Sequence, residues 1–500
     1  MPAGSVTMIA MARIAVVSAL VFASGGCAQL FGISETTGPD GQQQDLVTLD
    51  ITRVSIGASV VTGPQDITIN SATFYATDPG DPTSISETVA TEAGNEWSAP
   101  VDGTPSVVFT LPDYPMTLDH VMSLPSRAQT YGFEFYGHPN SQPPADAATL
   151  TLQATLPTPF AATESLMFMA AGTWTQYSLP ASGLPAVGTT AVNTTFNYAD
   201  TVNPYAGLPL QKFTTADALL LLRYDNNALT AVGTATPMDQ SDTSSTLVFG
   251  SLSAYAPTTT VAVPLDPSMD AARFAAQMPV GTSTGLSWRV NAAPGSGYAI
   301  GPVLQQGNAT EADTMIPMSY ANPFATTQSW TAYLTAYDTA TRAFTPATPA
   351  LPVTLYSQVV QVVAADANAS ISFPAAMPAT ITLAGVPLTS DGVTVALDST
   401  QPVSVSVTTD LTTTTLYQVH LYALVSNTAG TALQYQEVFN ASSDQPDFTF
   451  PPELFADGTY TLRVVCFAGG FPNAEVGDLT MHPFPFSYGL LDSGVFTVSH

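Results

Sequence analysis

Basic residues are scarce in this sequence, which has nine Lys and Arg residues against 38 Asp and Glu and a formal net charge of −29. Its single lysine is Lys212. Nucleic-acid binders need clustered Lys and Arg to displace counterions from phosphates, and polybasic membrane segments need the same residues. The composition therefore excludes a phosphate-tracking nucleic-acid binder and a polybasic membrane patch.

Cysteine and histidine are also rare, with two Cys and five His in 500 residues. The histidines, at positions 120, 138, 420, 482 and 500, never stand within five residues of one another. Metal sites built on nitrogen and sulfur ligands need clustered His or Cys. The sequence therefore predicts no metal site of this kind. Paired carboxylates for glycoside cleavage stay open, because such residues meet only in space.

Charged residues make up 9% of the chain and apolar residues 45%, which excludes intrinsic disorder. Length alone suggests three to four domains of about 100 to 200 residues each. Each unit is large enough to bury a core.

The N-terminal residues have the pattern of an export signal. Arg13 precedes residues 14–22, which are apolar except for Ser18, and this run has the length of a signal-peptide core rather than of a membrane-spanning helix. Ser24-Gly-Gly-Cys27 follows and resembles a bacterial lipobox, in which the cysteine is acylated. The resemblance implies lipidation of Cys27 and attachment to the cell envelope, at the outer membrane or the cell surface. An ordinary secretory signal with Cys27 as an incidental thiol is the alternative.

Strand-like alternation recurs along the rest of the chain. Residues 149–156 and 403–408 alternate apolar and polar side chains, and this period of two indicates half-buried strands of antiparallel sheets. The best helix candidate is 266–278, where Asp266 can cap and Pro267 fits the first helical position. We therefore predict an all-β chain of tandem immunoglobulin-like or fibronectin type III-like antiparallel β-sandwiches behind a flexible tether.

Breaks in the pattern divide the chain into six segments. They are a signal peptide (1–26), a tether (27–45), β-sandwich domain 1 (46–144), β-sandwich domain 2 (145–264), a β domain 3 with one short helix (265–365) and a fibronectin type III-like domain 4 (366–500).

Residues 454–464, Leu-Phe-Ala-Asp-Gly-Thr-Tyr-Thr-Leu-Arg-Val, resemble the entry to strand F of fibronectin type III domains. The resemblance implies a tyrosine corner, in which the hydroxyl of Tyr460 bonds back to the backbone. Strand parity then puts Cys466 on the buried face with Tyr460, and it turns His420 outward.

Two weak signals for chemistry remain. Acidic turns such as Asp78-Pro-Gly-Asp81 and Asp239-Gln-Ser-Asp242 place carboxylates where calcium could bind, but solvated turn carboxylates are the favoured interpretation. Gly281-Thr-Ser283-Thr-Gly285 matches the nucleophile elbow of α/β-hydrolases, but the elbow needs a strand before Ser283 and a helix after it, and here the expected order is inverted.

Tyr333 and Tyr337 are the predicted ligand-binding residues. The even positions of 330–336 read as core, so the odd positions present Thr and Tyr on the other face. Exposed Tyr rings can stack on sugars or anchor a protein partner, whereas cross-strand Tyr and Thr pairs can equally serve to stabilise a sheet.

These features together predict a non-enzymatic, lipid-anchored envelope protein that acts as an adhesion, scaffold or spacer module, with no catalytic residue and no cofactor. Its predicted partners are the membrane, through the N-terminal lipid, and a protein or glycan of unknown identity. A carbohydrate-binding surface protein is the first alternative, and a secreted hydrolase is the second.

Overall fold

A computed structural model gives the fold of the chain. It describes residues 46–57, 60–64, 72–78, 81–93, 96–102, 105–111, 118–137, 144–145, 147–173, 175–198, 211–266, 282–283, 285–294, 301–310, 312–325, 328, 330–480 and 483–500. Cys27, the tether and the predicted helix at 267–278 lie outside these residues.

The chain is all-β and is built mainly of antiparallel sheets, so the predicted fold class is confirmed. Helical structure in the described part of the chain is confined to 3-10 turns of three residues, at Ala171–Thr173, Ala181–Gly183, Pro452–Leu454 and Ala474–Val476. The alternation of apolar and polar residues in the sequence corresponds to alternating buried and exposed side chains in the strands. In β28 (Val403–Thr409) the three valines are buried, while Ser404 and Thr408 are exposed.

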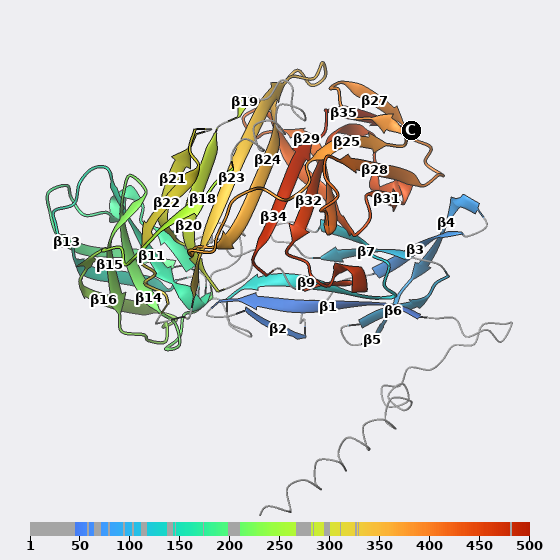
Figure 1. Ribbon diagram of the computed structural model, residues 1–500. Coiled ribbons are helices and arrows are strands. Elements are labelled where there is room, and N and C mark those ends of the chain that lie inside the picture. Colours follow the sequence, from blue (N-terminus) through green and yellow to red (C-terminus); the bar gives the residue numbers. More distant parts are fainter. Residues whose placement is uncertain are drawn as a thin grey trace, which may run out of the picture.

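One six-stranded sheet forms the base of the molecule (Figure 1). Its strand order is β33 (Asp478–Leu479), β9 (Ala128–Tyr136), β1 (Leu46–Ile56), β6 (Glu96–Pro100) and β5 (Thr91–Ala93), and β2 (Val60–Pro64) pairs with the far end of β1. The β1–β9 and β9–β33 pairs are parallel. This sheet therefore contains the first described residues of the chain as well as a segment close to its end.

A separate sandwich occupies one end of the molecule, on the left in Figure 1. Its three-stranded sheet is β13 (Ala191–Asn197), β10 (Thr149–Thr155) and β16 (Ser244–Ser251). Its five-stranded sheet is β12 (Thr175–Ser178), β11 (Glu164–Ala170), β14 (Leu219–Asp225), β15 (Ala228–Ala235) and β17 (Ser253–Ala254). Leu152 and Phe249 of the first sheet share a core with Phe168 and Leu221 of the second, so the two sheets pack face to face.

The largest sheet has fifteen strands and runs through the middle of the molecule. Its main path is β21 (Val303–Ala309), β20 (Leu286–Ala293), β23 (Thr331–Phe344), β24 (Val353–Ala364), β34 (Phe486–Asp492), β32 (Gly458–Gly469), β29 (Leu416–Ser426), β30 (Leu433–Ser443), β8 (Leu118–Ser123), β7 (Pro105–Leu111), β3 (Ala72–Asp78) and β4 (Asp81–Val89). Three shorter strands join beside this path, namely β19 (Thr282–Ser283), β27 (Val393–Ala396) and β35 (Phe496–Ser499).

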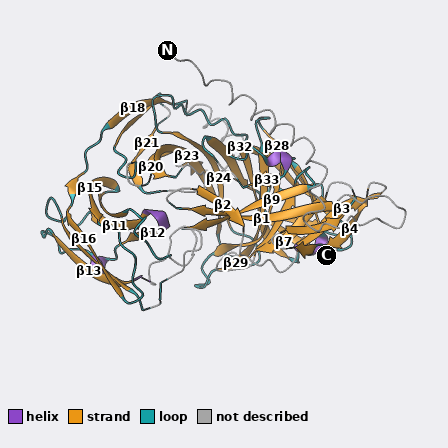
Figure 2. Ribbon diagram, turned by 90° about the horizontal axis from the view of Figure 1, so that it is seen from below, coloured by secondary structure: helices purple, strands orange, loops and turns teal. Residues whose placement is uncertain are grey.

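Strands assigned to different predicted domains share hydrogen bonds in this sheet. β24 pairs with β34 across the predicted boundary at residue 365, and β8 pairs in parallel with β30. Figure 1 shows β1 and β9 crossing beneath β34 and β32, and Figure 2 shows the base sheet from below. The domains are thus joined through backbone pairing as well as through linkers.

A four-stranded sheet packs on the C-terminal part of the large one. It consists of β26 (Val386–Pro387), β25 (Pro378–Leu383), β28 and β31 (Asp447–Phe450). A separate two-stranded sheet is formed by β18 (Thr259–Pro264) and β22 (Met315–Tyr320). Ile381 and Phe450 of the small sheet share a core with Val464 of β32. The tyrosine corner is confirmed, because the hydroxyl of Tyr460 donates to the carbonyl oxygen of Ala456 at 3.0 Å.

Candidate functional site

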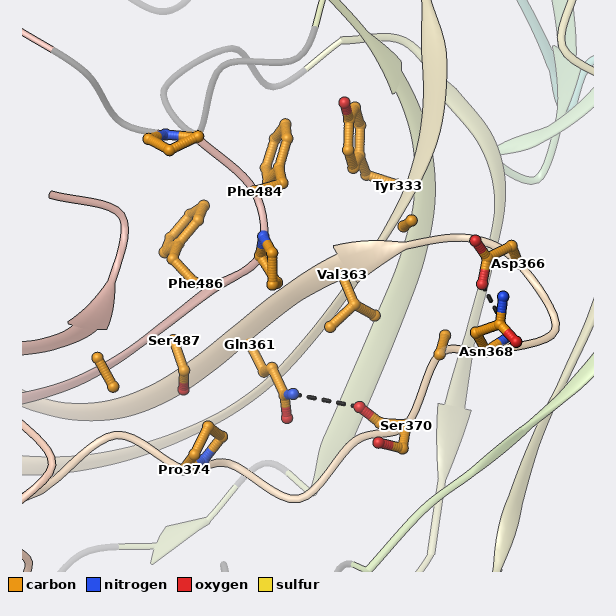
Figure 3. Close-up of a pocket in the computed structure, with 15 residues that line it drawn as sticks. Tyr333, Gln361, Val363, Asp366, Asn368, Ser370, Pro374, Phe484, Phe486 and Ser487 are labelled. Carbon is orange, nitrogen blue, oxygen red and sulfur yellow. Dashed lines mark hydrogen bonds between the residues drawn. The ribbon is translucent and has the colours of Figure 1, made fainter. Parts of the chain in front are cut away.

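A cavity of about 620 Å³ opens where the end of β24 separates from the start of β34 (Figure 3). Its walls come mainly from three stretches, β23 with the end of β24, the loop 366–374, and residues 483–487, and Ala468 of β32 completes the described lining. The volume lies in the range of about 300–1,000 Å³ that is typical of small-molecule sites. This cavity is the candidate functional site.

Aromatic rings form one wall of the cavity. Tyr333 of β23 and Phe484 stack with their ring centroids 3.7 Å apart at 31°, and Phe484 and Phe486 follow at 5.7 Å and 22°. The row continues inward to Tyr488, 6.3 Å from Phe486 at 12°. Each ring packs against the next, so contacts between the rings hold this wall in position.

Gln361 holds the loop that forms the opposite side. Its side-chain Oε1 accepts hydrogen bonds from the backbone N–H groups of Ser372 and Phe373, both at 2.8 Å, and its Nε2 donates to the carbonyl oxygen of Ser370 at 3.1 Å. Phe373 has a φ of 46° and a fully buried ring. A left-handed conformation at a bulky residue is costly, so these bonds and the buried ring are what keep it in place.

Polar groups line the rim on the side of the loop. Asp366, Asn368 and Ser370 all border the cavity, and Asp366 is the one charged residue among the described residues of the lining. The Oδ1 atom of Asp366 accepts the backbone N–H of Asn368 at 2.8 Å, which fixes the carboxylate at the mouth of the cavity. Figure 3 shows these side chains across the cavity from the aromatic wall.

The two predicted ligand-binding tyrosines have different surroundings. Tyr333 retains 9% exposure because Phe484 covers it, so the expectation of a fully exposed ring is wrong. Tyr333 nevertheless lines the cavity. Tyr337 is half-buried on the same face of β23, and its ring lies 5.2 Å from the guanidinium carbon of Arg289, away from the cavity lining. Ligand binding by either residue stays a prediction.

The acidic turns differ in what their carboxylates contact. Asp242 forms an ion pair with Lys212 at 2.6 Å, and the hydrogen bond from Lys212 lowers the pKa of Asp242. Asp239 accepts the backbone N–H of Thr215 at 3.0 Å. The side chains of Asp78 and Asp81 lie outside the described part of the structure. Among the described residues no group of three or more His, Cys, Asp or Glu side chains is placed to share a metal ion. Calcium binding stays a prediction.

Cys466 and His420 lie as strand parity predicts. Cys466 is fully buried, and burial raises the pKa of its thiol to about 12. His420 is on the outer side of β29, where its Nδ1 lies 2.7 Å from a carboxylate oxygen of Glu437.

Ser283 lies in β19, which pairs with Ala340 and Thr341 of β23, and its side chain is outside the described part of the structure. No helix in the described part of the chain is both long enough and apolar enough to cross a membrane.

A second cluster surrounds Arg463, and nothing in the sequence pattern indicated it. The guanidinium carbon lies 5.1–5.8 Å from the ring centroids of Tyr422, Tyr435 and Tyr356. Its Nε donates to the buried carboxylate of Asp492 at 2.7 Å, which also accepts the hydroxyl of Tyr435 at 2.9 Å. The charges of this cluster are therefore paired with one another, and its role is to tie β24, β34, β32 and β30 together.

The sequence did not indicate Phe484, Phe486 or Gln361 as site residues. The sequence feature that could have indicated the aromatic wall is the alternating Pro-Phe-Pro-Phe of 483–486, because its prolines restrict the backbone and its phenylalanines supply rings. Residues 366–370, Asp-Ala-Asn-Ala-Ser, begin like an EF-hand calcium loop, but Ile371 stands where that loop requires glycine.

Comparison with known proteins adds little to this description. No protein-family profile and no curated protein sequence matches the chain. Among solved structures, a Streptococcal ancillary pilin aligns with 66% of this chain and 98% of its own, at 9% sequence identity and a TM-score of 0.12. A similarity at this level supports no inference about fold or function.

Proposed function

We propose that this chain is a non-enzymatic, lipid-anchored protein of the cell envelope that acts as a rigid adhesion or scaffold module and presents the cavity as its binding site. The anchor is the acylated Cys27 of the lipobox-like Ser24-Gly-Gly-Cys27, and residues 28–45 are the tether between lipid and fold.

The observation that carries the proposal is the connection between the anchor side of the fold and the cavity. β1, which follows the tether, is flanked on both sides in its sheet, by β9 and by β6. β9 pairs in turn with β33, and the cavity wall at 483–487 follows β33 within a few residues. The strand that follows the tether is therefore linked to the cavity by backbone pairing as far as β33 and by the sequence from β33 to residue 483, which suits a protein that holds a ligand or partner at a surface.

The proposal is tested by metabolic labelling with palmitate. We expect the wild-type chain to take up the label and Cys27→Ala to lose it. Cys466→Ala is the matched control, since it removes the chain's other cysteine, which is buried, and should leave the labelling unchanged. An unlabelled wild type, or labelling that survives Cys27→Ala, contradicts the anchor.

Proteolysis of intact cells tests the scaffold role. We expect protease added to intact cells to degrade the wild-type chain, because the proposal displays the chain at the outer surface. Protease treatment after lysis gives the total amount of chain that the protease can degrade. Protection in intact cells contradicts a role in adhesion at the outer surface.

A further inference from the structure

We propose that the cavity between Tyr333 and Asp366 binds a saccharide that carries no negative charge. This inference rests on the proposed function and deepens it, because it names the ligand class of the binding site.

The charges of the described lining disfavour anionic ligands. Among the residues that the structure describes, Asp366 is the one charged residue that borders the cavity, with neither Lys nor Arg beside it. The whole chain carries a formal charge of −29, so its field opposes the approach of an anion. Phosphorylated, sulfated or uronic-acid ligands would enter a site without a countercharge.

The two sides of the cavity match the two chemical sides of a sugar ring. Phe484, which is half-buried, and the small exposed parts of Tyr333 and Phe486 supply apolar ring surface of the kind that packs against the C–H groups of a pyranose. Asp366, Asn368 and Ser370 supply oxygen and amide groups within the same cavity, which suit the hydroxyl groups on a sugar's edge (Figure 3). A purely apolar ligand would leave the rim groups unpaired, and a purely polar one would leave the ring wall unused.

Both sides are held in position before a ligand arrives. The stacking at 3.7 Å fixes Tyr333 against Phe484, and the bond to the backbone of Asn368 fixes the carboxylate of Asp366. The three hydrogen bonds of Gln361 fix the loop behind Ser370. Pre-ordered walls reduce the entropy that is lost on binding, which is the requirement for a site that recognises weakly interacting ligands such as sugars.

The test uses the full-length chain in detergent on an array of immobilised neutral, amino-bearing and acidic oligosaccharides. We expect binding to neutral or amino-bearing glycans and none to acidic ones. Titration calorimetry with the best-bound oligosaccharide then gives the dissociation constant for the variants.

Asp366→Asn keeps the size of the side chain and its local turn but removes the charged acceptor, and we expect it to weaken binding about tenfold or more. Asp398→Asn is the matched control, because Asp398 makes the same turn, with its Oδ1 2.9 Å from the backbone nitrogen of Thr400, at an exposed site outside the cavity. Tyr333→Ala should abolish binding.

Binding to acidic glycans, binding to none, or equal effects of Asp366→Asn and Asp398→Asn each overturn the inference. Tyr333→Ala removes a buried ring, so a loss of binding in this variant could reflect misfolding. Asp366 is exposed, so Asp366→Asn tests binding without disturbing the fold. Palmitate labelling and surface proteolysis do not depend on Asp366. The proposed function can therefore be contradicted or supported independently of the saccharide inference.

Discussion

Replacing Gln361 with alanine should release the loop that closes one side of the cavity. The substitution removes three hydrogen bonds, to Ser370, Ser372 and Phe373, each contributing about 0.5–1.5 kcal/mol to stability. It also removes the side-chain oxygen that accepts the N–H of Phe373, a residue whose φ of 46° is costly for a bulky side chain. We expect the free energy of local opening to fall by about 3 kcal/mol, which is roughly a hundredfold in the opening equilibrium.

Native-state hydrogen exchange measures this change directly, because it reports local opening in a chain too large for a single unfolding transition. The amides of residues 372 and 373 should exchange roughly a hundredfold faster in Gln361→Ala than in the wild type. Gln358→Ala is the control on the same strand. Gln358 bonds to the hydroxyls of Thr339 and Tyr488 rather than to the loop, so exchange at 372 and 373 should not change. Equal exchange rates in Gln361→Ala and the wild type would refute the argument that this side chain holds the loop.

Three further predictions concern the framework around the site. Tyr460→Phe removes the bond to Ala456 and should lower the free energy of local opening around the corner, measured by native-state hydrogen exchange, by about 1 kcal/mol; unchanged exchange there would show that the corner contributes nothing. Gly489→Ala would place a Cβ 2.3 Å from the backbone oxygen of Ala376 and should cost about 1–3 kcal/mol, whereas Gly63→Ala meets nothing within 4 Å and should be neutral by the same measurement. In Cys27→Ala the remaining thiol, Cys466, has a pKa of about 12, so at pH 8 about one molecule in ten thousand carries the thiolate. A thiol reagent should therefore react with it only after unfolding, and rapid reaction of the native protein would contradict its burial.

Local pattern predicted the features that depend on one strand at a time. The period of two placed Cys466 inward and His420 outward, because each strand alternates its side chains whatever it pairs with. The corner at Tyr460 followed from a short local motif.

Features that depend on distant segments were not predictable in this way. Tyr333 was expected on an open face, and Phe484, from a remote part of the chain, covers it. The parallel pairing of β8 with β30 leaves no mark in the alternation of either strand, because period two says which face is buried and not which strand is the neighbour. The cavity depends on such contacts, since its described lining comes from 333–364, 366–374, Ala468 and 483–487.

The β8–β30 pairing also sets an order of events during biosynthesis. Residues 118–123 leave the ribosome long before residues 439–443, and they have no hydrogen-bonded neighbour on that side until the later strand arrives. Pairings between remote segments form slowly, and an unsatisfied strand edge invites association with other chains in the meantime. We therefore expect assembly of the large sheet to finish only after β30 has been synthesised, and the edge of β8 to stay open to pairing with other chains until then.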